Sequence, residues 1–320
     1  MTSPAQVNGL WSVILAGGEG QRLSPFVQRW LGRHKPKQYC TFIGTRSMFQ
    51  HTLDRADQLC SAERRVTVIA ESHRREVMSQ LAGRPPGSII AQPSNRDTAA
   101  GVFLAASYIR TRAPKATLVV YPSDHFVYPE DRFVKLVESA VRVSDLIPEF
   151  LVLLAVVPNA IEPEYGWVRP GSSLGCMSGS DVWVVEEFVE KPSADVAREL
   201  MLARGLWNTL IVVAKVETIW AMGWRYFPEM MEVIEKCGSV IGTAKEKDVL
   251  DAAYRAIPSR NISSHLLQRI PKRIAAVEMK GVLWSDWGKP QRIVEALQHL
   301  GKKPAFPLEH APATCSVFQV

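Results

Sequence analysis

The 320-residue sequence contains few cysteines and no long hydrophobic segment. Its five cysteines are an odd number without any CxxC pair, which argues against a disulfide framework or a structural zinc and for a reducing compartment. The first ten residues lack the apolar stretch of a signal peptide. The longest apolar runs, 150–158 and 206–214, are too short to cross a bilayer. We therefore expect a soluble cytoplasmic protein without a membrane partner.

Long runs of like charge are also missing. The formal net charge is +6, but the basic residues are scattered, with only short clusters at 29–37 and 269–273. Scattered lysines and arginines usually form a solvated surface, so we expect no nucleic-acid partner. A site for small anionic ligands such as phosphates would also use several of these cations.

What the sequence does contain is an alternation of strand-like and helix-like segments. Continuous apolar, β-branched runs indicate strands that are buried on both faces. The expected strands are 11–16, 66–70, 88–91, 117–121, 151–157, 182–185, 209–214 and 274–277. The expected helices are 47–59, 73–81, 98–112, 131–145, 195–203, 243–256 and 290–300. This order predicts an α/β fold, a doubly wound, mixed but mostly parallel sheet flanked by helices in the Rossmann-like manner.

The domain organisation follows from where this alternation holds. Residues 1–300 are expected to form one catalytic domain, in which segment 158–180, rich in Gly, Pro and Ser, is a long loop or a hairpin. Residues 301–320 contain three prolines and little periodicity, so we expect an irregular tail on the surface.

A glycine-rich segment directly follows the first expected strand. It runs from Leu15 through Gly17, Gly18 and Gly20 to Arg22. Glycines there let backbone N–H groups approach phosphate oxygens, and an arginine can grip two of those oxygens. The spacing is neither that of a Walker A loop nor the dinucleotide fingerprint. A purely structural turn remains an equally good interpretation of this segment alone.

Four further polar segments contain candidate site residues. Lys37, beside Pro36, is either part of a solvated loop or a cation for developing phosphate charge. Asn95 or Asp97 is expected to cap the following helix, whose N-terminus is also an anion site. Asp124 follows the strand 117–121, where a carboxylate can hold magnesium together with substrate phosphates. Asp286, in a segment that ends at Gly288, is interpreted from the residues alone as a turn aspartate.

Six segments in order resemble the sugar nucleotidyltransferase family, and within it the mannose-1-phosphate guanylyltransferases. They are GGxGxRL at 17–23, PKQ at 36–38, QPSNRDTAA at 92–100, YPSDH at 121–125, FVEKP at 188–192 and WSDWG at 284–288. The resemblance covers residues 13–300 and implies a Mg²⁺-dependent enzyme. Such an enzyme joins a nucleoside triphosphate, for which GTP is the first choice, to a sugar 1-phosphate. Family habit implies a homodimer.

The resemblance also assigns roles to residues. It implies that Arg22, Lys37, Asp124, Lys191 and Asp286 are catalytic, with Asp124 and Asp286 sharing the metal. The implied nucleotide-binding residues are Leu15, Gly17, Gly18, Gly20, Asn95, Arg96, Thr98 and Ser123. The implied sugar-phosphate-binding residues are Tyr165, Gly166, Glu190, Lys191 and Asn208. His125 is expected to be structural.

Two departures from the family pattern fall near the expected sugar site. Thr209-Leu210 stands where many members have Ser-Gly after the asparagine, and Trp287-Gly288-Lys289 replaces a Val-Gly-Ser sequence. The sugar and the base therefore stay open, for example glucose 1-phosphate with UTP. A regulatory subunit without activity is a further alternative, although Arg22, Lys37, Asp124 and Asp286 are all present. A dinucleotide-dependent oxidoreductase is disfavoured by the glycine spacing, and a sugar isomerase activity is not expected on this chain.

Overall fold

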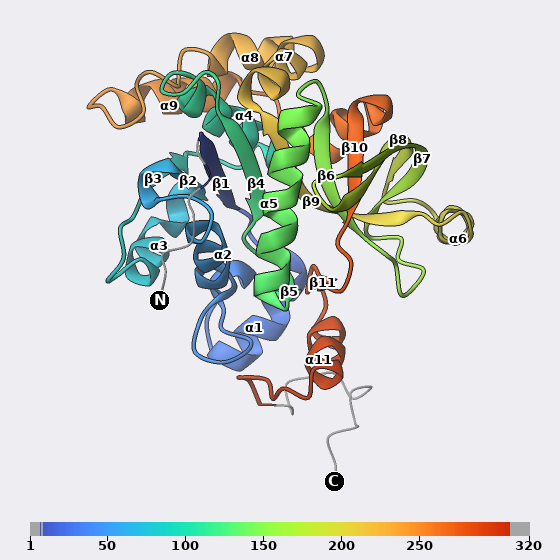
Figure 1. Cartoon of the computed structure of the whole chain (residues 1–320). Helices are drawn as coiled ribbons and strands as arrows, with labels where there is room; N and C mark the ends of the chain where they lie inside the picture. The colour runs from blue at the N-terminus through green and yellow to red at the C-terminus, as the bar shows by residue number, and fades with distance from the viewer. Residues whose placement is uncertain (1–6, 8, 308–320) are drawn as a thin grey trace.

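A computed structural model describes residues 7 and 9–307. Its centre is a nine-stranded sheet with the order β3-β2-β1-β4-β9-β6-β10-β8-β7 (Figure 1). The strands of this sheet are β1 Leu10–Ala16, β2 Arg65–Ala70, β3 Ser88–Gln92, β4 Thr117–Pro122, β6 Leu151–Val156, β7 Gly166–Met177, β8 Ser180–Glu190, β9 Leu206–Lys215 and β10 Ile274–Glu278. Parallel pairs join β3, β2, β1 and β4, while β9 lies antiparallel between β4 and β6. The sheet is thus mixed, with parallel core strands, in line with the predicted α/β fold class.

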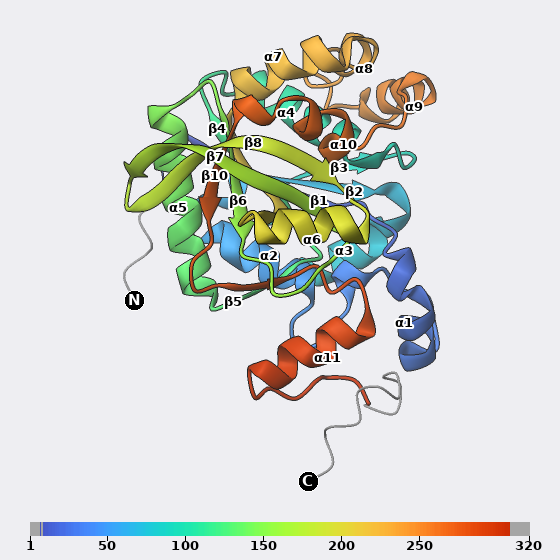
Figure 2. The same cartoon turned by 90° about the vertical axis from the view of Figure 1, so that its right-hand side faces the viewer.

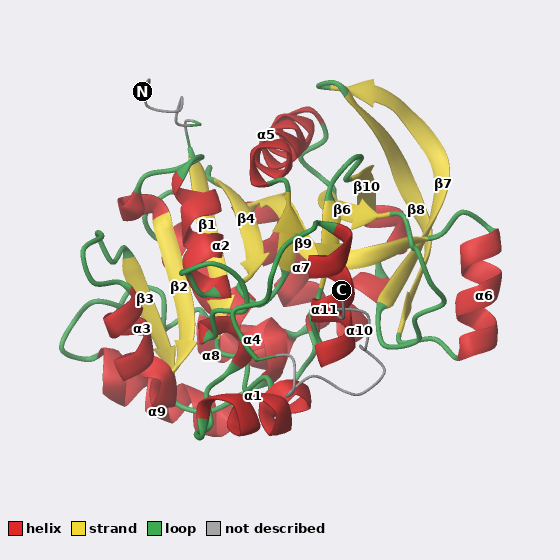
Figure 3. Cartoon of the chain, turned by 90° about the horizontal axis from the view of Figure 1, so that it is seen from below, coloured by secondary structure: helices red, strands yellow, loops and turns green. Residues whose placement is uncertain are grey.

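Helices cover both faces of the sheet. The α-helices are α1 Ser24–Leu31, α2 Met48–Asp57, α3 Arg74–Gln80, α4 Asp97–Arg110, α5 Glu130–Leu146, α6 Ala194–Leu202, α7 Val216–Tyr226, α8 Pro228–Ile234, α9 Glu246–Ala256, α10 Ile262–His265 and α11 Pro290–His299. Figure 3 shows α5 on one side of the strands and α4, α8 and α9 on the other. Successive side chains of a strand pack on opposite faces of the sheet. Val13 belongs to the core under α4, and Ile14 belongs to the core under α2 and α5. This alternation explains the continuous apolar runs.

A local sequence signal explains where α2 begins. Ser47 Oγ accepts the Gln50 N–H (3.1 Å), and Gln50 Oε1 accepts the Ser47 N–H (3.0 Å), so a capping box starts α2.

The segment 158–180 is a hairpin in its second part, because β7 pairs antiparallel with β8. A small sheet of β5, Phe126–Tyr128, and β11, Leu283–Ser285, was not predicted. It brings residue 286 beside residue 124.

The end of the described chain differs from the expected surface tail. Residues 301–307 are irregular, but Phe306 is buried and packs edge-on against Phe26 of α1, with ring centroids 5.0 Å apart. The Ala305 N–H donates to the Phe42 carbonyl (2.9 Å). Figure 2 shows α1 and α11 at the same end of the molecule. An aromatic contact at 306 thus ties the last described residues to the core; residues 308–320 of the expected tail lie outside the described residues.

The described residues include four of the five cysteines. Cys40, Cys60, Cys176 and Cys237 are free thiols there. No helix among the described residues is long and apolar enough to span a membrane.

Candidate active site

Four of the five predicted catalytic residues, all except Lys191, lie together at the carboxyl ends of β1 and β4. These strands are parallel neighbours, with Leu15 paired to Pro122. The glycine-rich loop leaves β1 and Asp124 follows β4, so both emerge at the same edge of the sheet. Ligands of open α/β sheets bind at this edge.

The glycine-rich loop is held in place by the short 3₁₀ helix Lys37–Tyr39. Gln38 Nε2 donates to the carbonyls of Ala16 (3.1 Å) and Gly18 (2.7 Å), and the Tyr39 hydroxyl donates to Ala16 (2.7 Å). Gly20 has φ +61°, and a Cβ there would lie 2.9 Å from the Lys37 backbone nitrogen. The loop therefore requires glycine at this position.

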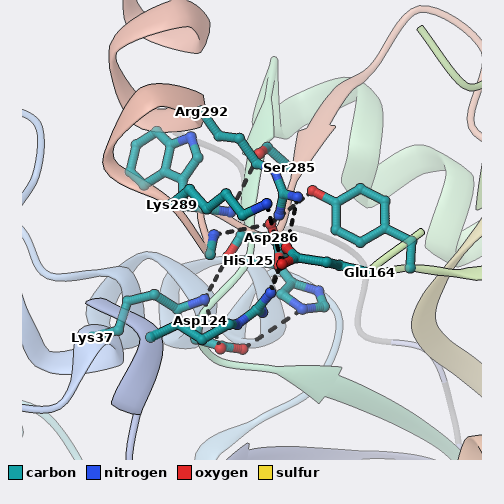
Figure 4. Close-up of polar contacts among 12 residues, drawn as sticks. Lys37, Asp124, His125, Glu164, Ser285, Asp286, Lys289 and Arg292 are labelled. Atoms are coloured by element: carbon teal, nitrogen blue, oxygen red, sulfur yellow. Dashed lines mark hydrogen bonds and ion pairs between the residues drawn. The ribbon is translucent and has the colours of Figure 1, made fainter. Parts of the chain in front are cut away.

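Lys37 joins the two expected metal ligands. Its buried Nζ lies 2.8 Å from Asp124 Oδ2 and donates to the backbone carbonyl of Asp286. Figure 4 shows the three residues converging from different segments. The structure thus brings together Lys37, Asp124 and Asp286.

The carboxylate of Asp286 is surrounded by donors. Its Oδ2 accepts from Arg22 (2.8 Å), whereas Oδ1 accepts from the Tyr165 hydroxyl (2.7 Å), Arg292 (2.7 Å) and the Gly288 N–H (2.9 Å). Burial alone would raise the pKa of Asp286, but Lys37, the Tyr165 hydrogen bond and Arg292 outweigh it and hold that pKa below its usual range. Asp286 is therefore ionised at neutral pH.

The same balance applies to Asp124. Burial opposes ionisation, yet the Lys37 ammonium and then His125 lower the pKa of Asp124. His125 itself packs edge-on against Trp284, with ring centroids 5.1 Å apart, and burial lowers its pKa. These contacts agree with the structural role expected for His125.

Arg22 does not project freely into the cleft. Besides Asp286, its guanidinium binds Glu164 Oε2 (3.0 Å), and about half of its side chain is exposed (53%). To reach a phosphate it must leave at least one of these carboxylates. The exposure of its side chain gives it that freedom.

A charged network behind Asp286 was missed by sequence reasoning. Arg292 on α11 binds Glu162 and, at 2.9 Å, Glu164, both in the loop before β7, and Lys289 lies 3.1 Å from Glu164. Figure 4 shows Glu164, Lys289 and Arg292 around Asp286. The acidic pair two residues apart, just before the predicted Tyr165, was the signal available in the sequence.

Two carboxylate groups are suited to magnesium. Within residues 7 and 9–307, no group of three or more His, Cys, Asp or Glu side chains could hold a metal ion. Magnesium, however, is usually bound by one or two carboxylates together with substrate phosphates. Asp124 Oδ1 lies 3.7 Å from His125 Nε2, and Asp286 Oδ2 is bound by the partly exposed Arg22. The donor set fits the ion, provided that Arg22 moves.

The loop 93–96 between β3 and α4, which the resemblance assigns to the nucleotide and which we call the nucleotide loop, differs in detail from the expectation. α4 begins at Asp97, and its N-cap residue Arg96 makes no capping hydrogen bond with its side chain. Asn95 Oδ1 accepts the Asp97 N–H (2.8 Å), and Asp97 Oδ1 accepts the Thr98 N–H (2.6 Å). The Arg96 guanidinium turns to the Tyr254 carbonyl (2.9 and 2.7 Å), so it braces the loop rather than facing the cleft. Thr98 Oγ1 accepts the Ile262 N–H (2.9 Å). Residues from the second half of the chain thus clamp this loop.

A cavity of about 240 Å³ lies between the glycine-rich loop and the nucleotide loop. Its lining includes predicted nucleotide-binding residues, namely Leu15, Gly17, Gly18, Asn95, Thr98 and Ser123, together with Asp124. Ser123 Oγ donates to the Leu15 carbonyl (2.8 Å), which couples the two strand ends. Gln92, which sequence reasoning missed, also lines the cavity; its Oε1 accepts from Tyr254 (2.9 Å).

The predicted sugar-binding residues form a second group. A Cβ on Gly166 would lie 2.6 Å from Glu190 Oε2 and 3.1 Å from Asn208 Nδ2, so glycine permits this close approach. Glu190 Oε2 is buried without a hydrogen-bond partner among the described residues, and burial raises the pKa of Glu190. Lys191 is exposed next to it. The Tyr165 hydroxyl is bound to Asp286, while its backbone carbonyl accepts the Lys191 N–H (3.2 Å).

The side chains of Trp287 and Leu210, one from each departure from the family pattern, have other surroundings. Trp287 is buried and stacks on Phe126, with ring centroids 4.2 Å apart, in the core formed with α1 and α11. Leu210 lines the cavity of about 240 Å³.

Unusual backbone conformations gather around the cleft. Six non-glycine residues of the described chain have positive φ, and four of them lie beside predicted site residues: Asp97, Lys191, Leu210 and Trp287. Such conformations cost free energy and persist at functional sites where surrounding structure enforces them.

Comparisons with known proteins identify the family of the chain. The sequence profile of the nucleotidyl transferases matches residues 11–303. The chain is 30% identical over 282 residues to a mannose-1-phosphate guanylyltransferase of Sinorhizobium fredii, covering 86% of this chain and 52% of that protein. It is 28% identical over 297 residues to the mannose-1-phosphate guanylyltransferase of Escherichia coli K12, and this match covers 91% of this chain and 60% of that protein. The chain thus spans about half to three fifths of the length of these relatives.

A solved structure shares the fold. The crystal structure of mannose-1-phosphate geranyltransferase from Thermus thermophilus superimposes with a TM-score of 0.76 at 23% identity, over 92% of this chain and 80% of that one. At this identity the likeness concerns the fold alone.

Proposed function

The chain belongs to the nucleotidyl transferase family, and from that membership we propose that it transfers a nucleotidyl group from a nucleoside triphosphate to a sugar 1-phosphate. GTP and mannose 1-phosphate are the first choice of substrates, in line with the names of its relatives. The observation that carries the proposal is the convergence of Lys37, Asp124 and Asp286 beside the glycine-rich loop.

The reaction is an in-line displacement. An oxygen of the sugar phosphate attacks the α-phosphorus and forms a new P–O bond, while the bond to the β-phosphate oxygen breaks and pyrophosphate leaves. The attacking oxygen is already anionic near neutral pH, so the reaction needs no general base. Positioning and charge neutralisation then carry catalysis.

The proposed roles follow the positions of the side chains. The backbone of Gly17, Gly18 and Gly20 cradles the phosphates, and Lys37 and Arg22 stabilise the leaving pyrophosphate. Lys191 orients the sugar phosphate, while Glu190 and Asn208 contact sugar hydroxyls. Asp124 and Asp286 would hold Mg²⁺, which neutralises phosphate charge when bound.

A pyrophosphate-release assay tests the proposal. The panel crosses mannose 1-phosphate and glucose 1-phosphate with GTP, UTP, dTTP, ATP and CTP in the presence of Mg²⁺. Preference for GTP with mannose 1-phosphate would support both reaction and specificity. Turnover of another pair would keep the reaction and change the substrates. Tight nucleotide binding without turnover of any pair would contradict the proposal and favour a regulatory subunit.

A further inference from the structure

Leu210 occupies a bulge in the central strand β9. The register between β6 and β9 shifts there, because Leu154 pairs with Ile211 while Ala155 pairs with Asn208. Neighbouring side chains lock the bulge: Asn208 Oδ1 accepts the Leu210 N–H (2.9 Å), and Thr209 Oγ1 donates to the Leu154 carbonyl (2.5 Å). Two side-chain hydrogen bonds therefore enforce the backbone conformation at Leu210.

That conformation is unfavourable for leucine. Leu210 has φ +57°, in the left-handed region where the Cβ of an L-residue is crowded and glycine is favoured. A strained leucine is retained only where its surroundings enforce the conformation. The position of its side chain indicates what this leucine does.

The side chain of Leu210 lines the nucleotide cavity. It shares this lining with Leu15, Gln92, Thr98 and Asp124, and it is half-buried against the core beneath α4. Asn208, only two residues away, points to Gly166 and Ser263 instead. The bulge thus directs position 208 to the sugar group and position 210 to the nucleotide cavity.

We propose that Leu210 is a specificity-determining residue for the nucleoside triphosphate. Its isobutyl group takes space from a small cavity and offers no hydrogen bond. A bound nucleotide must therefore present a C–H or ring face to it, and a nucleotide that places an amino or hydroxyl group there loses the hydration of that group without compensation. This inference rests on the proposed function, because it assumes that the cavity takes a nucleoside triphosphate.

Three variants separate space from strain. Leu210→Ala widens the cavity and keeps the backbone strain. Leu210→Gly widens the cavity and also removes the strain. Arg204→Gly is the matched control, because Arg204 is exposed after α6 with φ +58° and lies outside the cavity lining. Dissociation constants of the Mg²⁺ complexes of GTP, ATP, UTP, dTTP and CTP are measured by calorimetry on the intact chain, without sugar phosphate. Thermal unfolding is followed in parallel.

We expect both Leu210 variants to reduce the ratio between the weakest and tightest dissociation constants about tenfold or more, the scale set by removing a few carbons from a pocket wall. Arg204→Gly should leave that ratio unchanged, and Leu210→Gly should unfold at a higher temperature than Leu210→Ala. Ratios that stay within about twofold of wild type in both folded Leu210 variants would overturn the inference, as would a wild-type chain that binds none of the five nucleotides. Nucleotide binding with altered ratios but no turnover supports the inference and contradicts the proposed function alone.

Discussion

The guanidinium of Arg292 lies 2.7 Å from Asp286 Oδ1, six residues earlier in the chain. Arg292 is also bound to Glu162 and Glu164, and its guanidinium lies over the Tyr165 ring, 4.7 Å from the centroid. It therefore orients the carboxylate that is expected to share the metal. A residue that fixes a ligand in this way acts on the reaction without touching the substrate.

Replacing Arg292 by Met should lower kcat by about 10–100-fold, because Asp286 loses an orienting partner. The change should also destabilise the fold by about 3 kcal/mol, since it leaves partly buried carboxylates without their cation. Steady-state kinetics and urea unfolding measure the two effects. Arg142→Met, which breaks an exposed pair with Glu138, is the control and should change neither. Normal kcat in a folded Arg292→Met enzyme would contradict the positioning role.

Replacing Lys37 by Met should reduce kcat by at least about 100-fold, because it removes the cation proposed to stabilise the leaving pyrophosphate. Lys37→Arg should not restore activity, since the buried Nζ fits between Asp124 and the Asp286 carbonyl. Stopped-flow measurement of pyrophosphate release gives the rate of the chemical step. Lys280→Met serves for comparison, because Lys280 forms an exposed pair with Asp181. A Lys37→Met variant with a rate near wild type would remove Lys37 from the mechanism.

Replacing Asp124 by Asn should weaken divalent-cation binding. The amide keeps the size of the side chain but loses the charge that attracts the ion and pairs with Lys37. Mn²⁺ as a stand-in can be titrated into the nucleotide-free protein and followed by electron paramagnetic resonance. We expect an affinity loss of about tenfold or more. Asp195→Asn, on the exposed side of α6, should bind Mn²⁺ like wild type, and equal affinity in both variants would refute the metal assignment.

Replacing Glu190 by Gln should stabilise the protein at neutral pH. The pKa of Glu190 is raised in the folded state by burial, so the folded protein binds a proton more tightly than the unfolded chain. Wild-type stability therefore falls as pH rises from the unfolded glutamate pKa, about 4.3, to the raised folded value. The Glu190→Gln variant should lack this decline, and its Tm at pH 7 should be a few degrees higher than that of wild type. Glu138→Gln, at an exposed position, is the control for Tm. The KM of Glu190→Gln for the sugar phosphate should rise. A Tm difference that does not change with pH would count against an ionised, unpaired Glu190.

The catalytic centre could be predicted where a motif directly follows a strand. Gly17, Gly20 and Asp124 emerge from β1 and β4, so their meeting follows from the strand order and the parallel pairing. Asp286 was assigned by resemblance, and the unpredicted pairing of β5 with β11 explains how it reaches Asp124. These strands are short, and their pairing depends on tertiary packing.

The rest of the site depends on contacts between distant segments. Glu162 and Arg292 are 130 residues apart, and neither has a neighbour in the sequence that indicates the other. Arg96 was predicted to bind nucleotide, but a backbone carbonyl 158 residues away captures its guanidinium. The left-handed Leu210 results from the register of β9 on β6, which hydrophobic periodicity does not encode.

The central position of β9 has a consequence for synthesis on the ribosome. β4 and β6 precede β9 in the chain, but they are joined in the sheet only through it. Until residues 206–215 have emerged, the nascent chain carries two apolar strands with open hydrogen-bonding edges. Such edges pair readily with other chains. Between translation of residue 156 and residue 215 the growing polypeptide therefore lacks the neighbours of both edges of β6 and of one edge of β4.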